Sequence, residues 1–93
     1  MRITDFACKY FDTNIEDLKN KTDYKNTLQR HMVWYYMHNV QGVSNMKIAM
    51  MFDRDKRTVI YGISNMKYRI ERQKEYCELY NSFVSKYKEE TAK

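Results

Sequence analysis

Proline is absent from this 93-residue sequence, and glycine occurs only twice, at Gly42 and Gly62. Tight turns between β-strands usually depend on these two residue types, so their scarcity argues against a sheet. Cysteine also occurs only twice, at Cys8 and Cys77, and the two form no C-x-x-C pair. We therefore expect reduced, buried cysteines rather than a disulfide. The missing turn residues predict an all-α fold whose helices are joined by short polar loops.

Long apolar runs are missing as well. No stretch approaches the roughly 20 residues of a membrane-spanning helix. The first six residues, Met-Arg-Ile-Thr-Asp-Phe, lack the apolar segment of a signal peptide. These absences predict a cytoplasmic protein that does not enter a membrane.

The motifs of common catalytic and cofactor sites are also missing. A phosphate-binding loop has the pattern G-x-x-x-x-G-K, but Gly42 and Gly62 lie 20 positions apart, so we expect no ATPase in this chain on its own. His31 and His38 share one predicted helix, yet no third ligand lies near them and H-E-x-x-H is absent. We expect no metal, no cofactor and no enzyme activity.

The sequence does contain enough apolar residues for a core and an excess of positive charge. Hydrophobic residues make up 43% of the chain and aromatic residues 15%, which argues against global disorder. The length fits one domain, covering residues 1–93. Seventeen basic and 12 acidic residues give a formal charge of +5, which suits a polyanionic partner such as nucleic acid.

The spacing of apolar residues and the positions of capping residues predict five or six helices. They are expected at 4–11, 13–19, 26–39, 44–52 and from 56 onward, with a polar loop at 20–25. The predicted caps are Thr4, Thr13 in a capping-box pattern with Glu16, and Ser44. The last apolar stripe runs from Val59 to Tyr87 and is interrupted at Gln73 and Lys74, so we expect a bend near 71–74, although one long helix stays open. From about Glu89 the tail is expected to fray.

Residues 44–66 have the form of a helix-turn-helix: a short helix, a turn and a longer helix with a charged first turn. Asp55 is placed to cap the second helix, because a carboxylate can accept its free amide protons. Arg54, Lys56 and Arg57 supply long hydrogen-bond donors for guanine or phosphate, and Thr58 supplies a methyl group for thymine. The pattern therefore predicts double-stranded DNA as the partner.

A second hypothesis comes from the apolar stripe between Val59 and Tyr87. If the last helix continues without a bend, this stripe could pair with a protein partner or with a second copy of the chain. The chain would then be a helical interaction module. Binding that hardly responds to salt would favour this hypothesis, whereas DNA binding through cations weakens steeply as salt rises.

From Phe6 to about Tyr80 the sequence resembles the C-terminal DNA-binding domain of the bacterial replication initiator DnaA, which has a helix-turn-helix of the Trp-repressor type. The opening segment 6–18, the apolar helix that starts at Arg30, and the segment 44–52 are each similar to their counterparts in that family. Arg54-Asp55-Lys56-Arg57-Thr58-Val59 resembles the family signature Arg-Asp-His-Ser/Thr-Thr-Val, and this is the most specific match.

The resemblance implies a set of DNA-contacting residues. The signature residues would read bases in the major groove, Asn45 and Lys47 would touch phosphates, and the loop Lys19 to Lys25 would enter the minor groove. The residues expected to contact DNA are Arg54, Asp55, Lys56, Arg57, Thr58, Lys21, Lys25, Arg30, Asn45 and Lys47.

The sequence departs from the family pattern at two places. Lys56 and Arg57 replace the signature histidine and the serine or threonine after it, and the minor-groove loop has lysines but no arginine. Arginines read the shape of a narrow minor groove, so we expect more phosphate contact here and a different target site. The function predicted is control of replication initiation or transcription.

Tyrosine is frequent, with nine residues. Tyr35, Tyr61 and Tyr68 are expected on exposed faces of their helices, where they could stack on bases or form a partner surface. Most of the others fit the predicted core stripes.

Overall fold

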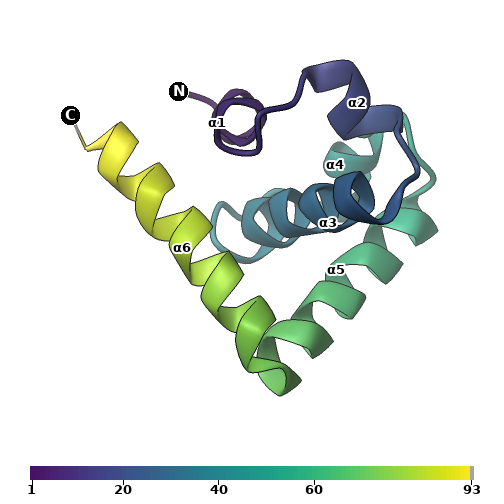
Figure 1. Cartoon of the computed structure of the whole chain (residues 1–93). Helices are drawn as coiled ribbons and strands as arrows, with labels where there is room; N and C mark the ends of the chain where they lie inside the picture. The colour runs from purple at the N-terminus through teal and green to yellow at the C-terminus, as the bar shows by residue number, and fades with distance from the viewer. Residues whose placement is uncertain (93) are drawn as a thin grey trace.

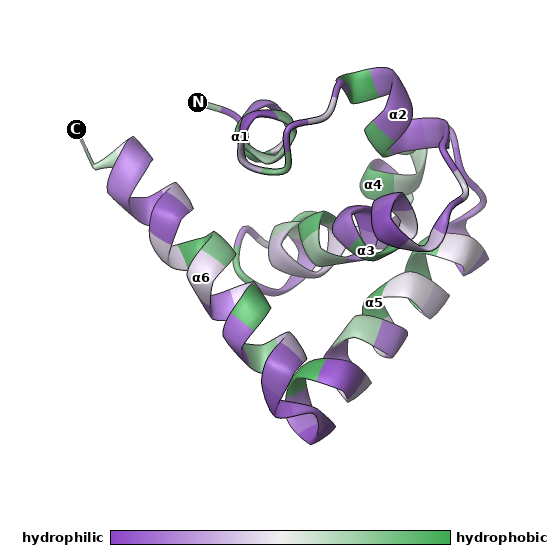
Figure 2. Cartoon of the chain, in the orientation of Figure 1, coloured by the Kyte–Doolittle hydropathy of each residue, from purple (hydrophilic) through white to green (hydrophobic). Residues whose placement is uncertain are grey.

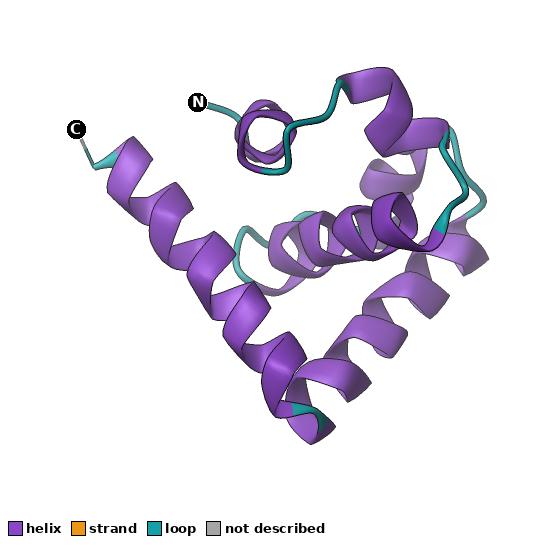
Figure 3. Cartoon of the chain, viewed as in Figure 1, coloured by secondary structure: helices purple, strands orange, loops and turns teal. Residues whose placement is uncertain are grey.

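The computed structural model describes residues 1–92, which form six α-helices and no strand (Figure 3). The helices are α1 (Ile3–Tyr10), α2 (Ile15–Asn20), α3 (Tyr24–Asn39), α4 (Asn45–Phe52), α5 (Lys56–Arg72) and α6 (Lys74–Thr91). The prediction of an all-α fold is confirmed. Among the helices of the described residues, none combines the length and the apolar character needed to cross a membrane.

Helix α3 lies in the middle of the molecule, with α1, α2 and α4 on one side and α5 on the other, while α6 runs from the end of α5 past α3 to α1 (Figure 1). Met32, Val33, Trp34 and Tyr36 are all almost completely buried, so this helix is covered on several sides rather than along one face. The colouring in Figure 2 shows apolar and hydrophilic segments alternating along α5 and α6, as expected of helices with one buried side. The central helix is thus the platform on which the helix-turn-helix and the C-terminal helix are both placed.

Gly62 allows α5 to lie very close to α3. A Cβ atom added at Gly62 would lie 2.8 Å from Cδ2 of His31 and 2.8 Å from Cε3 of Trp34. Any other residue at this position would clash with these two rings, so the rings or the helices would have to shift. The sequence could have indicated such a contact only through the isolated glycine inside a helical pattern.

The starts of α4 and α5 lie where the capping residues predicted, but the other three predicted starts differ. Helix α1 begins at Ile3, with Arg2 rather than Thr4 as its cap residue. Asn14, not Thr13, caps α2: its Oδ1 accepts the N–H of Asp17 at 2.8 Å. Thr13 instead closes α1, because its N–H bonds to the carbonyl of Cys8 at 2.9 Å. Helix α3 begins at Tyr24 rather than at residue 26, with Asp23 as its cap residue.

The break between α5 and α6 at Gln73 confirms the predicted bend near 71–74. Helix α6 then turns back onto the core. The rings of Phe83 and Tyr87 lie 5.5 and 5.2 Å from that of Phe6, and the ring of Tyr80 lies 5.1 Å from that of Tyr35. Most of the apolar stripe from Val59 to Tyr87 therefore packs inside the molecule. Little of it is left to bind a protein partner, so the interaction-module hypothesis is not favoured.

The C-terminal end of α6 extends beyond Glu89, where the sequence predicted fraying. The helix continues to Thr91, whose Oγ1 donates to the carbonyl of Tyr87 at 3.0 Å. Tyr87 is itself anchored, because its hydroxyl donates to the carbonyl of Met1 at 3.0 Å. Cys8 and Cys77 are free and only half-buried, which differs from the predicted full burial.

Candidate nucleic-acid interface

Helices α4 and α5 and the turn between them form the predicted helix-turn-helix. Ser44 caps α4 by accepting the N–H of Lys47 at 3.1 Å, and α4 ends at Asp53, whose φ of 53° is left-handed. The N–H of Arg54 then bonds back to the carbonyl of Ala49 at 2.9 Å. Asp55 opens α5, since its Oδ1 accepts the N–H of Arg57 at 2.7 Å, as predicted. The turn is thus fixed at both ends by hydrogen bonds.

The first turn of α5, which we call the helix tip, consists of Lys56, Arg57 and Thr58. All three side chains are exposed. The ion pairs found within residues 1–92 join Lys9 to Glu90, Lys74 to Glu78 and Lys86 to Glu89, and they involve neither cation of the tip. The tip is also the positive end of the dipole of a 17-residue helix. It therefore presents unneutralised positive charge to the solvent.

Arg54, just before the tip, has a different environment. Its side chain is half-buried, and its Nη2 donates to the carbonyl of Lys19 at the end of α2. Nε of Arg54 is buried without a hydrogen-bond partner in the described structure. This residue therefore ties the turn before α5 to the loop after α2, and only part of its guanidinium group is left for a ligand.

The loop predicted at 20–25 is shorter in the structure, where it consists of residues 21–23. Lys21 lies in this loop and Lys25 lies in the first turn of α3, and both are exposed. Asp23 accepts a hydrogen bond from Nδ2 of Asn26 at 2.7 Å, which holds the pKa of Asp23 below its usual value. This pair lies at the early start of α3, and sequence spacing alone did not reveal it.

Arg30, predicted to contact the DNA backbone, is inside the protein. It is only 5% exposed. Its Nη1 donates to the carbonyls of Leu18 at 2.9 Å and Lys21 at 3.0 Å, and its Nη2 donates to Oγ1 of Thr27 at 3.3 Å. Burial lowers the pKa of Arg30, and the nearby Arg54 lowers it further. The prediction for Arg30 is wrong: two of its acceptors, the carbonyls of Leu18 and Lys21, lie outside its own helix, where no helical pattern could reveal them.

The start of α4 presents one clear cation. Lys47 is exposed, whereas Asn45 is half-buried and its Oδ1 has no partner in the described structure. Arg2, which sequence analysis did not single out, lines a hollow of about 250 Å³ together with Lys47 and Met51. No motif marks Arg2, so only the fold brings it beside α4.

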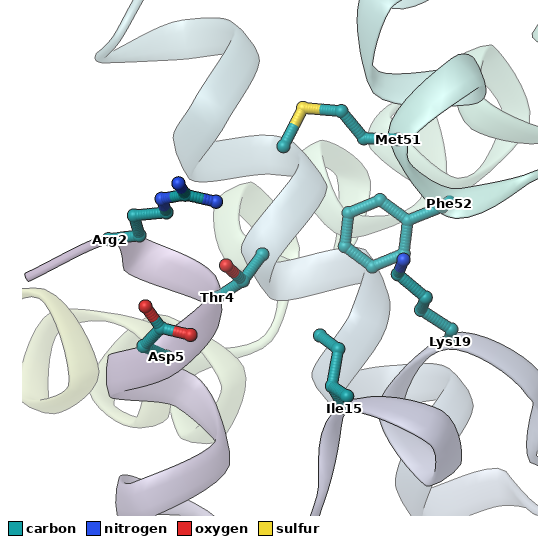
Figure 4. Close-up of a pocket in the computed structure, with 7 residues that line it drawn as sticks. All are labelled: Arg2, Thr4, Asp5, Ile15, Lys19, Met51 and Phe52. Carbon is teal, nitrogen blue, oxygen red and sulfur yellow. The ribbon is translucent and has the colours of Figure 1, made fainter.

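A neighbouring hollow of about 280 Å³ lies between α1, α2 and α4 (Figure 4). Arg2 and Asp5 lie on one side of it, and Lys19 lies beside Phe52 on the other. Because Asp5 accompanies Arg2, this hollow has mixed charge. The helix tip, in contrast, has two exposed cations, Lys56 and Arg57, and no carboxylate among its three residues.

The positive charge is unevenly distributed along the chain. Residues 54–72 contain six basic and two acidic side chains, and residues 19–25 contain three basic and one acidic. Residues 74–93 contain four of each sign. The excess of charge is therefore concentrated on α5 and on the loop that Arg54 connects to it.

A family described as bacterial dnaA protein helix-turn-helix matches residues 1–66 of the chain. The chain belongs to this family. The matched region covers α1 to α4 and the first part of α5, so it includes both the turn and the helix tip. The protein is thus a DNA-binding helix-turn-helix domain of the DnaA type, and the end of α5 and all of α6 lie outside the matched residues.

Proposed function

We propose that this chain binds double-stranded DNA by placing the tip of α5 in the major groove. One observation carries the proposal: Lys56 and Arg57 are exposed and have no carboxylate partner among the described residues. They lie at the start of a helix whose dipole also favours an anion. The turn before them is held by the caps of Ser44 and Asp55, so the tip is presented in a fixed orientation.

Each side chain of the tip suits a particular contact. Arg57 can donate two hydrogen bonds to O6 and N7 of guanine, and Lys56 can reach guanine or a phosphate. Thr58 can place its methyl group against that of thymine. Asp55 uses Oδ1 for its own helix, so at most its other oxygen can accept from the amino group of cytosine.

Other cations would hold the DNA backbone around the tip. Lys47 at α4 and Lys21 and Lys25 near the start of α3 are exposed and suited to phosphate contacts, with Asn45 beside Lys47. The loop of residues 21–23 has no arginine, so it would contact phosphates more than it would read the width of the minor groove. Arg54 would position this loop relative to the tip.

The process that this binding serves would be control of replication initiation or of transcription. The sequence has no phosphate-binding loop, so ATP-driven melting of DNA would require another segment or another protein. Bound at a target site, the chain would act by occupying the DNA or by recruiting such a partner.

The test combines selection of bound duplexes from a random pool with two variants. Arg57→Ala should weaken binding to the selected site by about 1–3 kcal/mol and relax the preference at one base pair. Lys47→Ala should weaken all duplexes alike and reduce the dependence of affinity on salt. Lys88→Ala removes the same charge from exposed α6 and should change little.

The proposal would be wrong if Arg57→Ala and Lys47→Ala bound duplex DNA as the unaltered protein does at moderate salt. It would also be wrong if Lys88→Ala weakened binding as much as they do, because general charge attraction would then explain the affinity. A selected site that coincides with the sites of the initiator would contradict the expected effect of Lys56 and Arg57.

A further inference from the structure

Helix α5 carries a continuous row of exposed side chains that extends well beyond its tip. After Arg57, the outward face contains Tyr61, Ser64, Tyr68 and Arg72, spaced four, three, four and four residues apart. This spacing keeps them on one face of a helix. Tyr61 is 70% exposed and Tyr68 is 54% exposed. We call Tyr61, Ser64, Tyr68 and Arg72 the α5 outer row.

The core does not account for these tyrosines. Tyr35, which was also predicted to be exposed, is half-buried against Tyr80. Tyr61 and Tyr68, in contrast, lie outside the aromatic cluster that α1, α3 and α6 build. Large exposed rings cost solubility, so two of them on one face of one helix suggest a ligand.

The duplex proposed above lies too far away to cover the whole row. Tyr68 is 12 residues beyond Lys56, which places it about 18 Å farther along the helix. A helix that enters the major groove by its tip directs its later turns away from the DNA. Tyr61 lies close to the groove, but Tyr68 and Arg72 remain free when the tip is bound. This step rests on the proposed function.

The chemistry of the row fits a single nucleic-acid strand. The guanidinium carbon of Arg72 lies 5.2 Å from the centre of the Tyr68 ring, so the charge is held beside an aromatic face. Lys67, the residue before Tyr68, is exposed on the adjoining side of the helix, and Glu71 is the one carboxylate within this stretch of α5. Aromatic rings on which bases stack, with cations for the phosphates, are the usual elements of single-strand sites.

A neighbouring cluster on the same helix is already occupied and is not part of this surface. Arg69 lies 4.9 Å from the centre of the Tyr76 ring, and its Nη1 donates to the hydroxyl of Tyr24 at 3.2 Å. The hydroxyls of Tyr24 and Tyr76 also bond to each other. These contacts join α3, α5 and α6, so Arg69 has a structural role, whereas Arg72 and Lys67 face the solvent.

We propose that the α5 outer row is a second nucleic-acid site, which takes a single DNA strand while the tip of α5 holds a duplex. Tyr68 stacks on a base, and Arg72 and Lys67 pair with phosphates. The hydroxyl of Ser64 and the ring of Tyr61 extend the contact toward the tip. A DNA-binding domain with both surfaces would bind next to a junction between paired and unpaired DNA.

Fluorescence anisotropy with two separate probes tests this proposal. A labelled oligothymidylate strand reports the outer row. A blunt hairpin duplex containing the selected site, closed by a non-nucleotide linker so that it has no unpaired base, reports the tip. Tyr68→Ala should weaken strand binding by about 5-fold to 150-fold through lost stacking. Tyr68→Phe should keep most of it, because the ring remains. Arg72→Ala should also weaken it, whereas Lys88→Ala, an equal charge change on α6, should not.

Several outcomes separate this inference from the proposed function. Tyr68→Ala should leave hairpin affinity unchanged, and excess unlabelled hairpin should not displace the strand from the unaltered protein. Normal hairpin binding without any strand binding would overturn the second site alone. Displacement of the strand by the hairpin would also overturn it, because one surface would then serve both. If the protein is folded, as its helical circular dichroism shows, but binds neither the strand nor the hairpin, both proposals are overturned. Much tighter binding of oligouridylate than of oligothymidylate would overturn the assignment to DNA and give the row to RNA instead.

Discussion

Arg30 in α3 and Arg57 in α5 carry the same side chain in opposite environments. Arg30 is buried and donates to the carbonyls of Leu18 and Lys21, so its charge is used to hold the end of α2 in place. Arg57 is exposed at the helix tip, with a hydrogen bond only through its backbone N–H among the bonds described. The difference teaches that a basic small domain cannot be assigned a DNA surface by counting cations, because some of them support the scaffold.

The largest effect is expected for the buried member of this comparison. Arg30→Ala should lower the free energy of unfolding by about 3 kcal/mol, since it removes the donor to the Leu18 and Lys21 carbonyls and opens a cavity. Arg30→Lys should restore only part of this, because one ammonium group cannot reproduce the planar fork. Urea denaturation measures the loss.

The affinity of the folded Arg30 variants for duplex DNA should stay within about twofold of the original, measured at low temperature where they remain folded. A variant with normal stability and weak DNA binding would show instead that Arg30 contacts DNA.

Arg54 is half-buried, between the buried Arg30 and the exposed Arg57, and its replacement should affect both stability and DNA affinity. Arg54→Ala should lower the free energy of unfolding by about 1–2 kcal/mol, because the Lys19 carbonyl loses its donor. It should also weaken all duplexes to a similar degree, because the loop of residues 21–23 is no longer held beside the tip. Denaturation and anisotropy on two unrelated duplexes measure these effects. A change in base preference at one position would contradict this positioning role.

His31 is buried near Arg30, and its protonated, charged form is disfavoured there. Burial, with Arg30 and Arg69 nearby, lowers the pKa of His31 from 6.5 to about 4. The unfolded chain therefore binds a proton at His31 at a higher pH than the folded chain does. The free energy of unfolding should thus fall by about 1–2 kcal/mol between pH 6.5 and 4 because of this residue, allowing for partial solvent screening.

The measurement is urea denaturation at a series of pH values for the original protein and for His31→Gln. Carboxylates such as Asp23 lose their contribution on acidification in both proteins, so the difference between the two curves isolates the histidine. Parallel curves through this range would contradict the assignment of a buried neutral imidazole.

The smallest expected effect is on duplex affinity, and it comes from removing the negative charge of Asp53 beside the tip. Asp53 and Asp12 are both left-handed residues at the ends of helices, with φ of 53° and 55°. Asn also accepts this conformation, so Asp53→Asn should leave stability nearly unchanged. It should strengthen duplex binding by about 0.5 kcal/mol through lost repulsion of phosphates. Asp12→Asn is the matched control, and an equal gain there would mean that position relative to the tip does not matter.

Sequence reasoning predicted those features of the fold that depend on local signals. The caps at Ser44 and Asp55, the break near Gln73 and the helix tip follow from residues within one or two turns of each other. The resemblance of residues 54–59 to the DnaA signature located the recognition helix in the same way. These features could be predicted because the atoms that determine them are neighbours in the chain.

The features that were missed depend on contacts between distant segments. The burial of Arg30 requires acceptors 9 and 12 residues earlier, and the tie from Arg54 to Lys19 spans 35 residues. Thr13 was predicted as a cap because its spacing to Glu16 was right, but the end of α1 uses its backbone N–H. Charged residues follow no hydrophobic period, so sequence patterns alone could not divide the cations between the interior and the surface.

The close approach at Gly62 has a consequence for how new binding preferences can arise. Because the backbone of α5 lies directly against the rings of His31 and Trp34, movements of the recognition helix toward these rings are blocked by steric contact. Changes in target sequence would then have to come from exchanging side chains at positions 56–58 on an unmoving support. Such a domain is suited to grafting, because new residues at the tip would have the same position and orientation as the present ones.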